Sequence, residues 1–126
     1  MNDQLNNSQT EKKYDLEERT ARLAEKIIEL VRKIRITAIN KGIIEQLVGS
    51  GESIGANYCE ANEAESRKDF IHKMGIAKKE TKETKHWLRL LAKSNPEVKK
   101  EIRKLWKESQ ELLLIFSSII KNSKKK

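Results

Sequence analysis

The sequence predicts an all-α protein, an antiparallel up-and-down four-helix bundle. Of its 126 residues only five are Gly and one is Pro, whereas charged residues make up 37 % and the hydrophobic class another 37 %. Sandwiches and barrels need many turn residues, so this composition favours helices. Apolar residues also recur at steps of three and four along four successive segments, as on helices that bury one face. We expect a disordered polar arm at residues 1–13, the bundle at 14–122 and a basic tail at 123–126.

The first two helices are predicted at residues 16–36 and 37–61. The second has apolar residues at helical spacing but also holds four of the five glycines, and each Gly inside a helix costs up to about 1 kcal/mol. Propensity alone would place a loop at Gly49 and Gly51. Because the apolar spacing continues on both sides, we expect one helix whose small face packs against a neighbour.

Two polar signals mark the boundaries of the last two helices. Ser66 and Asp69 have the spacing of a helix N-cap box, so the third helix follows a connection at residues 62–65. Pro96 comes directly after Ser94 and Asn95. Because Pro stops one helix and fits the first position of the next, the fourth helix is expected to begin there. Connections this short make neighbouring helices antiparallel.

Acidic residues and histidine on the third helix raise the question of a metal site. Glu80, Glu83 and His86 follow one another at steps of three, but di-metal bundles need a Glu-x-x-His pair on each of two helices, and the second pair is missing. We therefore expect Glu80 and Glu83 to accept hydrogen bonds from a facing helix. Cys59 is the only thiol and has no His near it in sequence, so it is expected to be a buried or half-buried packing residue. The sequence predicts no catalytic residue, no metal and no cofactor, and hence no enzyme.

The net charge is +8, and residues 93–126 carry ten basic and four acidic groups, a balance of +6. Two lines of cations lie at helical spacing: Lys78, Lys82, Lys85 and Arg89 on the third helix, and Lys100, Lys104 and Lys107 on the fourth. Such lines can follow a phosphate backbone without reading bases, but they are also typical of a solvated helix surface. Both interpretations stay open. Because we find no aromatic platform of the kind used to read single-stranded RNA, any binding should have low sequence specificity.

Surplus apolar residues bear on assembly. The first helix has apolar side chains on more than one face, and the fourth ends in an apolar run at residues 112–120. A monomer would expose this surplus, which favours a homo-oligomer over the alternative of a wide core face. The chain has neither an apolar run of about 20 residues nor a secretory signal, and a single Cys suits a reducing compartment. We expect a cytoplasmic protein with no membrane contact.

Three blocks of the sequence, residues 53–60, 66–70 and 76–88, resemble the bacterial "four helix bundle protein" family, also called 23S rRNA intervening-sequence proteins. The likeness covers roughly residues 20–122. It rests on Ser53, Asn57, Glu60, Arg67, Phe70, Glu80, Glu83 and Trp87. The family has no accepted catalytic residues, so the resemblance implies that these positions hold the fold. It further implies an up-and-down bundle, a homopentameric ring and a role with nucleic acid.

The resemblance leaves two functions open. In the first, a non-enzymatic oligomeric bundle binds structured RNA, such as rRNA, or DNA through its basic helix faces. In the second, the protein is an interaction scaffold or an accessory subunit without direct contact to nucleic acid. A related group of proteins serves in this way as accessory subunits of the reverse transcriptases of diversity-generating retroelements.

Overall fold

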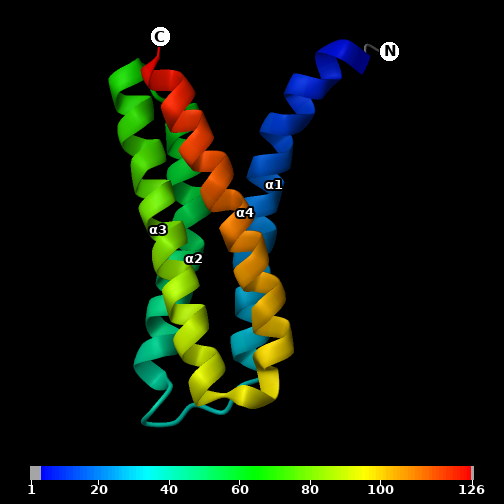
Figure 1. The fold of residues 1–126 in the computed structure, drawn as a ribbon, viewed down its shortest axis with the longest axis vertical. Coiled ribbons are helices and arrows are strands. Elements are labelled where there is room, and N and C mark those ends of the chain that lie inside the picture. Colours follow the sequence, from blue (N-terminus) through cyan, green and yellow to red (C-terminus); the bar gives the residue numbers. More distant parts are fainter. Residues whose placement is uncertain (1–3, 126) are drawn as a thin grey trace.

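The computed structural model describes residues 4–125, with side chains from Leu16 onward. Its helices are α1 (Gln4–Arg32), α2 (Lys41–Asn62), α3 (Arg67–Ser94) and α4 (Lys99–Lys124), and a short 3-10 turn, η1 (Pro96–Val98), precedes α4. Successive helices run antiparallel, and α3 packs between α2 and α4 (Figure 1). α1 packs mainly on α2 and makes less contact with α4. No strand occurs in the described range, and the predicted four-helix bundle is confirmed.

α1 begins earlier than predicted. Residues 4–13, expected as part of the disordered arm, form its first turns. This stretch contains no Gly or Pro, and extending an existing helix is far easier than starting one. Residues 1–3 of the predicted arm, like Lys126 of the predicted tail, lie outside the described residues.

The structure has a break between α1 and α2 that the sequence does not predict. The first helix is predicted to reach residue 36, but α1 ends at Arg32. Residues 33–40 instead form a linker, organised by the buried side chain of Asn40. The amide N–H of Thr37 donates to Asn40 Oδ1 at 2.8 Å, and Asn40 Nδ2 donates to the carbonyl of Arg35 at 3.0 Å. Asn40 Nδ2 also lies 3.1 Å from Oδ1 of Asn95, which joins the linker to the turn between α3 and α4. These hydrogen bonds satisfy backbone N–H and C=O groups of the linker without a helix. Because they come from a polar side chain, the spacing of apolar residues does not predict the break.

α2 is a single helix through its glycines, as predicted. A Cβ atom added to Gly51 would lie 2.7 Å from Cδ1 of Ile27, and one added to Gly55 would lie 3.0 Å from Oγ1 of Thr20. Both contacts are with α1. The expectation that the small face of this helix packs closely against a neighbour is therefore confirmed.

The predicted boundaries of α3 are confirmed. The side chain of Ser66 caps the helix by accepting a hydrogen bond from the amide N–H of Asp69 at 3.0 Å, and the helix ends at Ser94. Pro96 opens η1 rather than α4 itself, which starts at Lys99. The apolar residues that recur at helical spacing on α3 and α4 supply most of what these two helices contribute to the core. The buried ones are Met74, Ala77, Leu88, Leu91, Ile102, Leu105, Leu112 and Phe116.

Candidate nucleic-acid interface

A groove of about 970 Å³ runs along α3 and α4 beside the turn that joins them. Five cations line it, two from the end of α3 and three from the first half of α4: Arg89, Lys93, Lys99, Arg103 and Lys107. None of the residues that the structure describes along this groove is acidic. Five positive charges with no carboxylate among the described lining residues raise the local potential and attract polyanions. We call this feature the cationic groove.

An exposed indole also lines the cationic groove. Trp106 of α4 is 37 % exposed and lies among apolar lining residues that include Leu90 and Ile102. Lys85 of α3 approaches the ring, with Nζ 4.4 Å from the ring centroid, and the same Nζ donates a hydrogen bond to Gln110. A cation at this distance from an aromatic ring is attracted to it. The groove thus combines cations with an aromatic surface, although the sequence alone predicts no aromatic platform.

The structure brings together only part of the predicted cation set. Arg89, from the line on α3, and Lys107, from the line on α4, both reach the cationic groove. Lys85 is half-buried and held by α4, whereas the exposed Lys82 and the half-buried Lys78 lie outside the residues lining the groove. Lys100 is exposed on α4 and lines neither of the two grooves described here.

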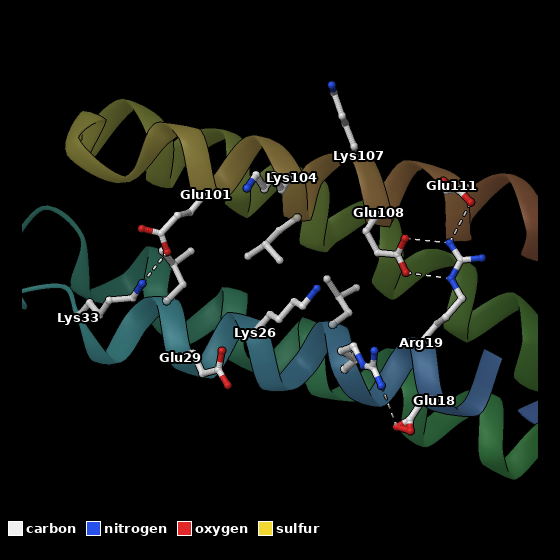
Figure 2. Close-up of a pocket in the computed structure, with 14 residues that line it drawn as sticks. Glu18, Arg19, Lys26, Glu29, Lys33, Glu101, Lys104, Lys107, Glu108 and Glu111 are labelled. Carbon is white, nitrogen blue, oxygen red and sulfur yellow. Dashed lines mark hydrogen bonds and ion pairs between the residues drawn. The ribbon is translucent and has the colours of Figure 1, made fainter. Parts of the chain in front are cut away.

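A second groove, of about 690 Å³, separates α1 from α4 (Figure 2). Lys104 and Lys107 line it, but Lys107 points away from α1 in this view. Six cations and five glutamates share its walls, and several of them are paired. Arg19 donates to Glu108 at 2.8 Å and to Glu111 at 3.1 Å, and the hydrogen bond to Glu108 is the main reason why the pKa of Arg19 is raised. Because its charges nearly cancel, this groove attracts polyanions less than the cationic groove does.

The residues that sequence reasoning missed follow a simple pattern. Lys99, Arg103 and Lys107 recur at steps of four on α4, as Arg89 and Lys93 do on α3. Lys107 also fits the helical spacing of Lys100 and Lys104, which is the line that the sequence predicts. Only the position of the turn at Pro96, with the two helices side by side, shows which line on α4 faces α3.

Three of the residues that carried the family resemblance form hydrogen bonds within α2 or between α2 and α3. Asn57 Nδ2 donates to the carbonyl and the hydroxyl of Ser53, one turn earlier, at 2.9 and 3.0 Å. Glu60 of α2 accepts a hydrogen bond from Lys73 of α3 at 2.8 Å. Phe70 and Trp87 are partly buried against the core, while Arg67 and Glu83 are exposed.

Glu80 lies half-buried on α3, where its charged neighbours are on the same helix rather than on a facing one. Burial raises the pKa of its carboxyl, nearby Glu83 raises it further, and Lys79 lowers it. The Nζ atom of Lys79 is 3.9 Å from the carboxylate. The buried hydroxyls of Thr84 and Ser50, 2.9 Å apart, provide a polar link between α3 and α2.

The described side chains that could bind a metal ion or act as a nucleophile do not come together in one site. Among the side chains that the structure describes, in residues 16–125, no three of His, Cys, Asp or Glu come together in a way that could hold a metal ion. Cys59 is exposed, contrary to the expectation that it packs inside, because the neighbouring Tyr58 occupies the buried position on α2. No helix within residues 4–125 is long and apolar enough to cross a membrane.

Comparisons with known proteins agree with this fold. The family described as 23S rRNA-intervening sequence protein matches residues 12–118. The chain belongs to this family. A solved structure from Bacteroides thetaiotaomicron, described as a protein of unknown function from the S23 ribosomal protein family, is 34 % identical with a TM-score of 0.72. That similarity covers 83 % of this chain and 97 % of the other. A comparison with curated proteins found no match.

Membership of the 23S rRNA-intervening sequence protein family confirms the resemblance carried by the three sequence blocks. The matched range includes every residue that lines the cationic groove. The basic surface of α3 and α4 is therefore part of the family domain rather than of an added tail.

Proposed function

We propose that this protein is a non-enzymatic, self-associating helical bundle that binds structured RNA or DNA through its basic helix faces, with low sequence specificity. The cationic groove is the observation that carries the proposal, because its five cations have no acidic residue among the described lining residues. The name of the family makes ribosomal RNA the first ligand to test. Self-association is supported by large apolar side chains that the single chain leaves exposed, Ile28 on α1 and Leu114 on α4.

Phosphate contacts explain both the affinity and the low specificity expected. Each phosphate neutralised by Lys or Arg releases condensed counterions, so affinity falls as salt rises, by about 0.9 log unit per log unit of salt for each phosphate of a duplex. Contacts of this kind position a protein on nucleic acid but carry no base information. Fragments of rRNA and unrelated hairpins should therefore bind with similar affinity.

Filter binding at increasing salt tests the proposal with an rRNA fragment and an unrelated hairpin of equal length. The double variant Arg89→Gln/Lys107→Gln removes the two predicted cations that reach the cationic groove. It should lower the slope of log affinity against log salt concentration by about two, since each lost phosphate contact removes about one unit of that slope. At low salt it should weaken binding at least about tenfold.

The matched control is Lys41→Gln/Lys68→Gln, which makes the same charge change at exposed positions early in α2 and α3. It should bind nearly as well as the unmodified protein. If the unmodified protein fails to bind either RNA at the lowest salt, or if both double variants lose the same affinity, the proposal is wrong.

The second candidate function is a protein-interaction scaffold or accessory subunit, which the exposed apolar side chains also favour. Leu114 is 60 % exposed and lies on a different part of α4 from the cationic groove. Purifying a tagged copy from its own host, with and without nuclease, separates the two functions. A defined protein that remains bound after nuclease treatment, with no RNA in the untreated eluate, would favour the scaffold.

A further inference from the structure

We propose that the cationic groove prefers single-stranded nucleic acid to a duplex, with phosphates on its cations and a base packed against Trp106. This inference rests on the proposed function and assigns the ligand class of the same site. A purely electrostatic surface would attract any polyanion. The presence of an exposed indole among the cations is the feature that separates one kind of nucleic acid from another.

The composition of the groove matches what a single strand exposes. Half of the lining residues are cationic and the rest are apolar, including Leu90, Ile102 and Trp106. A duplex presents its phosphates outward but hides the faces of its bases in the stack. A single strand presents phosphates and unstacked base faces together, and proteins that bind it combine basic grooves with aromatic side chains. The apolar half of this groove would have no partner on a duplex.

Trp106 is held in place by the neighbouring helix. Lys85 of α3 contacts the ring and also donates a hydrogen bond to Gln110, one turn further along α4. These contacts join both helices at the ring and reduce its freedom to move, while more than a third of the residue stays exposed. A base that packs on an aromatic side chain already held in place loses less entropy than one that must order it.

Cations are positioned to hold the strand on either side of such a base. Arg103 precedes Trp106 by three residues, and residues three apart on a helix are neighbours. Lys107 follows Trp106 directly and also lines the groove. Phosphates flanking a base on Trp106 would lie near these two groups, and Arg89 and Lys93 supply positive charge from the α3 side.

Fluorescence anisotropy with labelled oligonucleotides of equal length tests the inference on the full chain. The probes are single-stranded RNA, single-stranded DNA, a blunt duplex, and polyglutamate of matched charge. Single strands should bind at least about fivefold more tightly than the duplex, since stacking on one aromatic residue contributes that much or more. Polyglutamate should bind more weakly than either single strand, because it offers charge without bases.

Two variants isolate the role of the ring. Trp106→Leu should weaken single-strand binding at least about fivefold while changing duplex binding less than twofold. Trp106→Phe, which keeps an aromatic ring beneath Lys85, should restore most of the affinity. Ile39→Ala is the control, since it trims another exposed apolar residue, in the linker between α1 and α2 and outside the groove. Circular dichroism checks that each variant folds.

The emission of Trp106 gives an independent readout. The chain has two tryptophans, so a Trp87→Phe background leaves Trp106 as the only indole. A base packed against it should quench its emission when single-stranded RNA or DNA is added.

The outcomes separate this inference from the proposed function. Equal binding of single strands and duplex, with Trp106→Leu unchanged, overturns the inference and leaves nucleic-acid binding intact. Failure to bind any nucleic acid overturns both. If polyglutamate binds as tightly as the single strands, the groove recognises charge alone and an acidic protein segment becomes the better ligand.

Discussion

At the residue scale, two glycines determine how closely α1 approaches α2. Gly51 and Gly55 face α1 with almost no room for a methyl group, whereas Gly49 has open space beside it. Gly55→Ala should lower the free energy of unfolding by about 1–3 kcal/mol, because Thr20 is β-branched and cannot give way without moving α1. Gly49→Ala should raise that free energy by about 0.5–1 kcal/mol through helix propensity. Urea unfolding of the two variants measures both effects, and changes of the same sign would contradict this account.

Glu80 makes stability depend on pH. Burial and Glu83 raise the pKa of its carboxyl above the usual value of 4.5 in the folded protein. The ionised form is therefore less favourable in the folded than in the unfolded chain, and stability falls as pH rises from 4.5 through the raised pKa. Glu80→Gln should increase the Tm at pH 7, and the gain should disappear below pH 4.5. Glu52→Gln, at an exposed position on α2, should change the Tm little at either pH.

At the scale of the helices, the sequence predicts an element well where local chemistry and apolar spacing agree. Ser66 and Pro96 are strong local signals, and the structure places helix boundaries at both. The linker at residues 33–40 was missed because the polar side chain of Asn40 organises it, through hydrogen bonds to the backbone of the linker and to the distant Asn95, and apolar spacing carries no sign of such bonds. The extension of α1 to Gln4 was missed because a polar segment without apolar spacing gives no helical signal.

The contact between α1 and α4 depends in part on one forked ion pair. Nε and Nη2 of Arg19 donate to the two carboxylate oxygens of Glu108 at 2.9 and 2.8 Å, and both side chains are less than a third exposed. A double-mutant cycle with Arg19→Met and Glu108→Gln should give a coupling energy of about 0.5–1 kcal/mol that decreases as salt rises. The same cycle on the more exposed pair Arg22 and Glu18 should give less than about 0.5 kcal/mol. Equal coupling for the two pairs would contradict the role assigned to Arg19.

At the scale of the whole molecule, charge composition predicted the kind of surface but not its location. The basic excess of residues 93–126 indicated where to look. Apolar spacing identifies the buried face of each helix, but it does not say which flank of α4 meets α3 and which meets α1. The orientation of α4 decides which cations lie away from glutamates. Lys104 lies beside the glutamates of the α1–α4 groove, whereas Arg103 lies in the cationic groove.

The exposed apolar side chains predict that the chain is not a monomer in solution. Leu114 is 60 % and Ile28 is 43 % exposed, on helices that make little contact with each other. Sedimentation equilibrium should give a multiple of the chain mass, and Leu114→Lys should shift the protein toward the monomer, since a buried charge opposes association. Lys100→Leu, on an exposed face of the same helix, serves as the control. A monomer at micromolar concentration would contradict the prediction.

The first described turns of α1 and the last turns of α4 lie at the opposite end of the bundle from the turn between α3 and α4 (Figure 1). Lys121 follows Arg103 by 18 residues, which is about 27 Å along a helix that rises about 1.5 Å per residue. The lysines at the end of α4 therefore carry positive charge that is separate from the cationic groove, and a duplex shorter than about eight base pairs, at about 3.4 Å each, cannot span the distance between them. A fluorophore or surface anchor joined beyond the described ends of α1 or α4 would leave the cationic groove unobstructed.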